Sequence, residues 1–300
     1  MTLHEGEIAV DVGLVRGLLE EQCPGWAGME LARVGGGSDN SMFRLGDELL
    51  VRVPRTAAHS VRKEHMWLPR LAPKLSWPVP EPVYAGTPTG AFPFPWSVSR
   101  WIDGEEAGAG RVADWSLFGA ELASFVTELH GIDLMGARRA DELEWYRGGS
   151  LVPCDGWVTE ALDGCRALAG DALDLDALER MWRDALTLPE PSGPHVWLHG
   201  DLKPTNLLVR DGRLHAVIDF GALSVGHPDA EHAPAWDLPP AARAAYWNAL
   251  SLSPTTWTRA RAWAIAVGAA GLSYYWTTFP AFVAECRARL EAILTDTTTP

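Results

Sequence analysis

The first hundred residues carry short apolar runs of strand length, and the rest of the chain carries longer runs with helical spacing. Apolar residues at alternate positions predict a strand, and apolar residues three and four apart predict a helix. Helices are predicted in the second part of 8–22 and over Ala57–Leu71, which stops before Pro73. The predicted strands are Met29–Val34, Ser41–Leu45, Glu48–Val53 and, as an edge strand after a proline-rich stretch, Trp96–Trp101.

After Asp103-Gly104 helical spacing dominates, and a single hairpin near 207–218 interrupts it. The fold class expected from this order is α+β and bilobal. A small β-rich N-terminal lobe would span residues 1–100, and a larger, mostly helical C-terminal lobe would span 101–300. Clefts between such lobes are common ligand sites. The helices predicted in the second lobe are Trp115–His130, Asp155–Leu168, Leu175–Leu186, Pro240–Leu250, Thr256–Thr277 and Pro280–Leu294.

The composition is that of an ordinary soluble globular protein, with 47% hydrophobic and 21% charged residues. No apolar run is long enough to span a membrane, and the acidic N-terminus lacks a signal-peptide core, so we expect a cytoplasmic protein without a membrane partner. The four cysteines are scattered and are expected to be reduced. The net charge of −14 disfavours nucleic acid and would attract a cationic small molecule. Monomer and homodimer both stay open.

Acidic groups suited to moving a phosphoryl group with metal ions stand in two short motifs. They are His199-Gly200-Asp201-Leu202-Lys203-Pro204-Thr205-Asn206 and Val217-Ile218-Asp219-Phe220-Gly221. Asn206 follows Asp201 by five residues, and Asp219 follows it by 18. This spacing matches the kinase pattern in which the first Asp serves the attacking hydroxyl while the Asn and the second Asp hold magnesium. The alternative is a surface hairpin with incidental polar ends.

The segment between the two metal-ligand candidates predicts a β-hairpin, because apolar runs flank Asp211-Gly212. A two-residue turn there pairs Arg210 with Arg213, Leu208 with His215 and Asn206 with Val217. Paired residues share a face of the sheet, and so do alternate residues of a strand. Asn206 and Asp219 would then be diagonal neighbours, close enough to hold hard cations through oxygen ligands.

A glycine-rich segment and an ion pair are the candidates for holding nucleotide phosphates. Gly36, Gly37, Ser38 and Asn40 lie between two predicted strands, where a glycine backbone can approach phosphates closely. Arg52 on the third strand could neutralise the phosphates, and Glu64 on the following helix could fix its position. The alternatives are an ordinary glycine-rich hairpin turn and an unrelated surface Arg and Glu.

Over most of its length the chain resembles the aminoglycoside phosphotransferase (APH) family, small-molecule relatives of the protein kinases. The HGDLxxxN and IDFG motifs are the specific part of the resemblance, and Leu50–Arg55, Lys63–Pro69 and Trp96–Gly104 extend it. The resemblance implies a protein-kinase-like fold. Its N-terminal lobe would bind nucleotide, and its C-terminal lobe would carry catalysis and acceptor binding.

The resemblance also implies roles for single residues. Asp201 would orient or deprotonate the acceptor hydroxyl, and Asn206 and Asp219 would ligate Mg²⁺. Arg52, where the family usually has Lys, and Glu64 would take the roles of the lysine–glutamate pair. The backbone of Arg100–Ile102 would contact adenine. The cofactors implied are ATP, or in some members GTP, and Mg²⁺, and His199 is expected to shape the catalytic loop.

The segment Gly226–His232 departs from the family pattern, because His227 stands where Asp is common and Glu231-His232 replaces Asp-Leu. Those Asp residues usually brace the catalytic loop, so a nucleotide-binding pseudokinase is one alternative. The acceptor would be a small hydroxyl compound. Acidic residues in 155–184 would suit an aminoglycoside antibiotic, or could be a solvated helix face. Macrolides, other hydroxylated metabolites and amino alcohols stay open, and a metal-dependent hydrolase using His199 and Asp201 lacks further ligand spacing.

Overall fold

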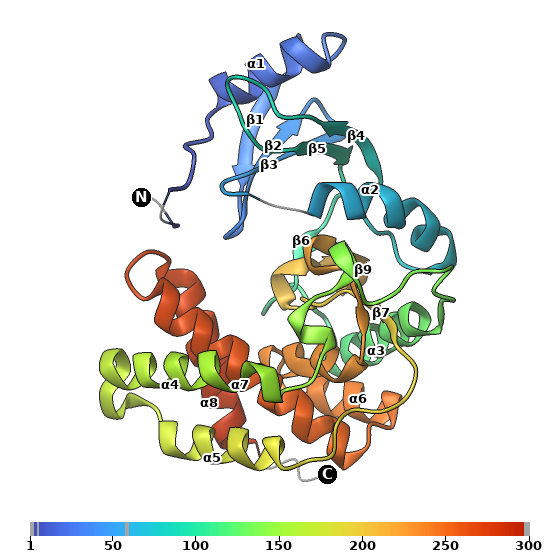
Figure 1. Ribbon diagram of the computed structural model, residues 1–300. Coiled ribbons are helices and arrows are strands. Elements are labelled where there is room, and N and C mark those ends of the chain that lie inside the picture. The colour runs from blue at the N-terminus through green and yellow to red at the C-terminus, as the bar shows by residue number, and fades with distance from the viewer. Residues whose placement is uncertain (1–2, 5, 58–59, 297–300) are drawn as a thin grey trace.

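The computed structural model describes residues 3–4, 6–57 and 60–296, and it has a sheet-bearing N-terminal part above a helical C-terminal part (Figure 1). The N-terminal elements are α1 (Val12–Gln22), β1 (Leu31–Gly35), β2 (Asn40–Leu45), β3 (Leu49–Pro54), α2 (Ser60–Leu71), the 3₁₀ turn η1 (Ala72–Lys74), β4 (Pro82–Gly86) and β5 (Trp96–Arg100). The mixed α+β class predicted from the sequence is confirmed.

The N-terminal sheet has the strand order β1-β2-β3-β5-β4, with every neighbouring pair antiparallel. The prediction that Trp96–Trp101 forms an edge strand is wrong, because β5 pairs with β3 on one side and with β4 on the other. The edge strand on that side is β4, which the sequence did not predict because prolines surround it. Proline is tolerated at an edge, where one row of backbone groups needs no partner.

Packing of α1 on this sheet forms a separate small core. Val15, Leu18 and Leu19 of α1 are buried in one cluster with Phe43 and Val51. Alternate side chains of β2 and β3 supply the sheet's contribution, as the period of two requires. This core holds β3 rigidly, and β3 carries Arg52.

The C-terminal part surrounds short strands with helices (Figure 1). Its helices are α3 (Trp115–Gly131), α4 (Asp155–Ala169), α5 (Leu175–Leu186), α6 (Pro240–Leu250), α7 (Pro254–Tyr275) and α8 (Pro280–Thr295). Its strands are β6 (Glu105–Glu106), β7 (Val196–Leu198), β8 (Leu207–Arg210), β9 (Arg213–Val217) and β10 (Ser224–Gly226). The 3₁₀ segments are η2 (Asp141–Leu143), η3 (Tyr146–Gly148), η4 (Val152–Cys154), η5 (Gly170–Ala172), η6 (Pro204–Asn206), η7 (Phe220–Ala222) and η8 (Pro228–Asp237).

The larger core lies among these helices, and α7 passes through it with buried residues on all sides, among them Trp263, Ile265 and Leu272. The four cysteines are free and buried, as predicted. No helix in the described part of the chain is both long and apolar enough to cross a membrane.

Candidate active site

Asp201 lies in the loop between β7 and η6, and cationic groups surround its carboxylate. Arg147 donates to Oδ1 at 3.0 Å and also to the carbonyl of Gly200, and the Nζ of Lys203 lies 4.0 Å from Oδ2. Burial would raise the pKa of Asp201, but Arg147 and Lys203 outweigh it and hold this pKa at about 2. The carboxylate is therefore fully ionised at neutral pH.

Asn206 is oriented by the same carboxylate. Its Nδ2 donates to the backbone carbonyl of Asp201 at 2.8 Å and to Oδ2 of Asp201 at 3.2 Å. Within the described residues the Oδ1 of Asn206 accepts no hydrogen bond, so this oxygen is left for a cation. An amide oxygen is a ligand that Mg²⁺ accepts.

His199 connects the catalytic loop to the strand that leads to Asp219. The N–H of Asp201 donates to Nδ1 of His199 at 3.1 Å, so the ring proton resides on Nε2, which donates to the carbonyl of Ile218 at 2.9 Å. Burial lowers the pKa of His199, which agrees with a neutral ring that uses both nitrogens. These contacts agree with the expected structural role of His199.

Glu231 holds the catalytic loop, His199–Asn206, through hydrogen bonds to its backbone. Its two carboxylate oxygens accept the N–H groups of His199 at 2.8 Å and Gly200 at 2.7 Å, and the side chain is buried. The sequence had suggested that replacing the family's Asp here weakens the loop. The structure corrects this expectation, because a glutamate in the buried turn η8 reaches both backbone donors.

The hairpin that precedes Asp219 forms with the predicted turn but not with the whole predicted register. Arg210 pairs with Arg213, and Asp211 and Gly212 both have positive φ, as a two-residue hairpin turn requires. A bulge at His215 then shifts the register, so that Leu208 pairs with Ala216, Leu207 pairs with Val217 and Asn206 does not.

The backbone segments that carry Asn206 and Asp219 are nevertheless hydrogen-bonded neighbours. The carbonyl of Asn206 accepts the N–H of Ile218 at 2.9 Å, and Asp219 follows directly with a left-handed backbone, φ 63°. That conformation is uncommon for a residue with a side chain and is tolerated best by Asn and Asp. It ends the strand and presents the carboxylate to the N-terminal part.

Arg52 ties the two parts together through Asp219. Its Nη1 donates to Oε2 of Glu64 at 2.7 Å, as predicted, and its Nη2 donates to Oδ1 of Asp219 at 2.8 Å. Burial would lower the pKa of Arg52, but the carboxylates of Glu64 and Asp219 raise it further above its usual value. The forked guanidinium bridges two carboxylates at once, which a lysine ammonium does less well. The contact with Asp219 was not predicted.

The glycine-rich turn connects β1 and β2, as predicted. Gly36 lies so close to the carbonyl of Asn40 that an added Cβ would be 2.6 Å from it, whereas a Cβ on Gly37 would meet nothing within 4 Å. Nε2 of His4 donates a hydrogen bond to the carbonyl of Ser38 at 2.9 Å. Gly36 is thus needed for the turn itself, and Gly37 leaves open space above it.

Within the segment predicted to contact adenine, Arg100–Ile102, two of the three backbone N–H groups are already bonded within the protein. The N–H of Arg100 donates to Glu81 at 2.9 Å, and that of Trp101 donates to Glu48 at 2.8 Å. Arg100 therefore cannot offer its N–H to a base. The N–H of Ile102 has no protein partner within the described residues and remains available.

Arg147 is the site residue that sequence reasoning missed. It reaches Asp201 because Gly148 of η3 packs backbone to backbone against Gly226 of β10, where an added Cβ would lie 2.4 Å from the carbonyl of Gly148. His227 also donates to that carbonyl at 2.9 Å. The only local feature in the sequence is that Gly148-Gly149 follows Arg147, and this pattern does not indicate which residue Arg147 contacts.

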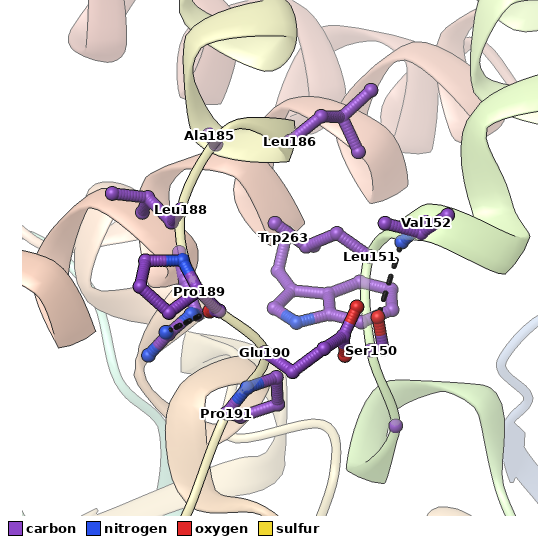
Figure 2. A pocket seen from close by; sticks show the side chains of 12 residues that line it. Ser150, Leu151, Val152, Ala185, Leu186, Leu188, Pro189, Glu190, Pro191 and Trp263 are labelled. Atoms are coloured by element: carbon purple, nitrogen blue, oxygen red, sulfur yellow. Dashed lines mark hydrogen bonds between the residues drawn. The ribbon is translucent and has the colours of Figure 1, made fainter.

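A cavity behind this segment is too small for an acceptor. It is lined by residues 149–152, by Ala185, Leu186 and residues 188–191, and by Arg259 and Trp263, and Figure 2 shows the indole of Trp263 between the first two stretches. Its volume is about 10 Å³, room for at most a single water. The face of Asp201 is the better candidate for acceptor binding.

Comparisons with known proteins agree with this arrangement. The chain matches the phosphotransferase enzyme family, APH, over residues 30–263. No curated protein is detectably similar in sequence.

Solved structures with the same fold are distant in sequence. An aminoglycoside phosphotransferase in complex with GDP and kanamycin superposes with a TM-score of 0.71 at 17% identity, covering 93% of this chain and 98% of that one. A macrolide 2′-phosphotransferase from Brachybacterium faecium superposes with a TM-score of 0.58 at 22% identity, covering 93% of this chain and 97% of that one. The APH(2″)-IIa enzyme in a ternary complex with streptomycin and ATP superposes with a TM-score of 0.58 at 17% identity, covering 95% of this chain and 97% of that one. On the family match over most of its length, this chain belongs to the APH phosphotransferase enzyme family.

Proposed function

We propose that this phosphotransferase moves the γ-phosphoryl group of ATP to a hydroxyl of a small molecule, with Asp201 at the acceptor oxygen. The observation that supports the proposal is that hydrogen bonds link the segments that carry Asp201, Asn206 and Asp219. Asp201 is bonded to Asn206, and the backbone of Asn206 is bonded to the residue before Asp219. Asp219 in turn meets Arg52 from the opposite part of the molecule.

The residues present fit a magnesium–nucleotide complex. Oδ1 of Asn206 and the carboxylate of Asp219 would hold Mg²⁺, with phosphate oxygens and water completing the oxygen ligands that the ion prefers. Within the described residues no group of three His, Cys, Asp or Glu side chains forms a metal site, so the protein alone does not supply a full set. When bound, the metal would neutralise phosphate charge during transfer.

Asp201 would act mainly by orienting the acceptor. With a pKa of about 2, it is a weak base, but its carboxylate accepts a hydrogen bond from a hydroxyl and aims that oxygen at the γ-phosphorus. The acceptor oxygen bonds to phosphorus while the bond to the leaving diphosphate breaks, and the hydroxyl proton is finally released to solvent. Such a transfer needs little base strength, because its transition state is loose.

Arg52 would move from one anion to another in this scheme. In this structure it pairs with Asp219 and Glu64, and with nucleotide bound it would contact phosphates while keeping Glu64. Backbone N–H groups of the turn at Gly36–Ser38 and of Ile102 would supply the remaining nucleotide contacts. ATP is proposed as the donor, and GTP is the alternative that the experiment separates.

A catalytically silent nucleotide-binding module is the second candidate, and one observation disfavours it. This candidate was motivated by the departure of Gly226–His232 from the family pattern, which suggested a weakened catalytic loop. Glu231 nevertheless holds that loop through two hydrogen bonds. The test is incubation with MgATP or MgGTP and a panel of aminoglycosides, macrolides and hydroxylated metabolites, followed by mass spectrometry. We expect one phosphoryl group on at least one acceptor, and none with Asp201→Asn. Nucleotide binding without transfer to any acceptor, or transfer that survives Asp201→Asn, would refute the proposal.

A further inference from the structure

The side of Asp201 reached by Arg147 is lined by aromatic rings. Trp145 and Tyr146 are adjacent, with ring centroids 5.0 Å apart, and expose 39% and 36% of their surfaces. Trp157 and Trp263 support Tyr146 from behind at 5.8 and 5.9 Å. Exposed rings that pack on one another and on the indoles of Trp157 and Trp263 make a platform on which the apolar face of a ring can stack.

Arg147 lies between this platform and the carboxylate. Its Nε donates to the phenol oxygen of Tyr146 at 3.0 Å, its guanidinium carbon lies 5.5 Å from the Tyr146 ring, and its Nη1 donates to Asp201. Within the described residues Nη2 has no hydrogen-bond partner. A hydroxyl placed at Asp201 is thus next to a guanidinium edge that still has hydrogens to donate.

Further cations stand around the same place. The Nζ of Lys63 is 6.0 Å from the centre of the Trp145 ring, and it makes no hydrogen bond within the described residues although the residue is buried. Lys203 lies beside Asp201 and over the ring of Phe282 at 5.0 Å. The nearby carboxylate of Glu285 faces Lys203. Lys63 also lies near the carboxylates of Glu64 and Glu142, so the cations that directly flank Asp201 are Arg147 and Lys203.

Some of the acidic residues in 155–184 that might have attracted a polycation are used in ion pairs. Arg183 pairs with Asp155 at 2.7 Å, and Arg166 pairs with Glu179 at 2.6 Å. Arg166 also reaches Asp163 and Asp176, each at 3.0 Å. These four carboxylates of α4 and α5 are therefore paired within the protein.

From the free Nη2 of Arg147 and the two cations that flank Asp201, and on the basis of the proposed function, we propose that the acceptor carries no cationic group beside its reacting hydroxyl. It is a neutral or anionic hydroxylated ring compound that stacks on Trp145 and Tyr146, and Arg147 donates from Nη2 to an oxygen next to the reacting one. An amine at that position would face the guanidinium across a short distance in a partly dry site, where like charges repel strongly. Arg147 is thus a specificity-determining residue.

The test compares acceptors in matched pairs that differ only in charge: glucosamine with N-acetylglucosamine, and kanamycin with its fully N-acetylated form. The kcat/KM with MgATP should be at least about tenfold higher for the acetylated member of each pair. If turnover is too slow, dissociation constants measured with a non-hydrolysable ATP analogue bound give the same ratio. Preference for the free amines overturns this inference and leaves the proposed function intact. Failure to bind the nucleotide at all would instead refute the function.

Variants assign the preference to Arg147. Arg147→Met should reduce the acetyl-over-amine ratio to about one or reverse it, whereas Arg62→Met, which removes an exposed arginine paired with Glu142, should leave it unchanged. Trp145→Ala provides a second route if Arg147→Met does not fold. It should raise the KM of ring acceptors about tenfold or more without altering the KM of ATP. An unchanged ratio in folded Arg147→Met, or an unchanged KM in Trp145→Ala, contradicts the assignment.

Discussion

Glu231→Gln tests whether the buried brace holds the catalytic loop. The carboxylate now accepts one N–H on each oxygen, from His199 and from Gly200. A glutamine of the same size keeps one acceptor oxygen and turns an NH₂ group toward the other N–H. Two donors then face each other in a buried place, and one backbone N–H loses its partner.

The expected cost follows from the loss of that partner. A buried donor without an acceptor costs about 1–3 kcal/mol. At about 3 °C per kcal/mol, Tm should fall by about 3–9 °C. The next residue along the loop is Asp201, so we also expect kcat to fall about tenfold while the KM of ATP changes little.

Thermal unfolding followed by circular dichroism gives the first quantity, and acceptor-dependent ADP release gives the second. Glu160→Gln is the matched control, because Glu160 is exposed on α4. The reasoning is refuted if Glu231→Gln melts and turns over like the control. A stability loss without a change in kcat would show that Glu231 supports the fold but not the placement of Asp201.

Three further outcomes are expected. Asp201→Ala should lower kcat at least about 100-fold and leave nucleotide affinity within about twofold in calorimetric titration, and turnover near the wild-type rate would exclude the orienting role. Asp219→Ala should weaken magnesium-dependent nucleotide binding at least about tenfold, which an unaltered magnesium titration would contradict. His232 is buried, and burial together with nearby His130 lowers its pKa to about 3, so the neutral ring is favoured by folding. Its contribution is complete above pH 6.5 and is lost as pH falls toward 3, about 3 kcal/mol by pH 4, so His232→Phe should flatten that stability slope in denaturant titrations and an equal slope would speak against it.

Local pattern was enough to predict most of the helices and the strands β1, β2, β3 and β5, but not β4. Alternation identified β2 and β3, and helical spacing identified α3 to α8, because these elements pack against a core. The pairing of Arg52 with Glu64 also followed from the sequence, since the strand and helix that carry them are consecutive in the kinase pattern.

Contacts between distant segments could not be predicted in the same way. The bulge at His215 changes the hairpin register, and nothing in the alternation of that segment marks an extra residue. The pairing of Arg147 with Asp201 joins residues from η3 and the catalytic loop, and it depends on how two glycine backbones pack. Glu231 contacts the loop only because the 3₁₀ turn η8 places it there. The sequence does not predict that position, so a Glu where the family has Asp appeared to weaken the loop.

The contact of Gly148 with Gly226 limits how this enzyme can be redesigned. Any side chain at Gly226 would push η3 away from β10, because its first carbon would overlap the main chain of Gly148. Libraries meant to change acceptor range should therefore vary positions 145 and 146, whose rings face outward, and leave 148 and 226 fixed. A natural lineage that acquired new acceptors would be under the same restriction, and its variation should concentrate on the two aromatic positions.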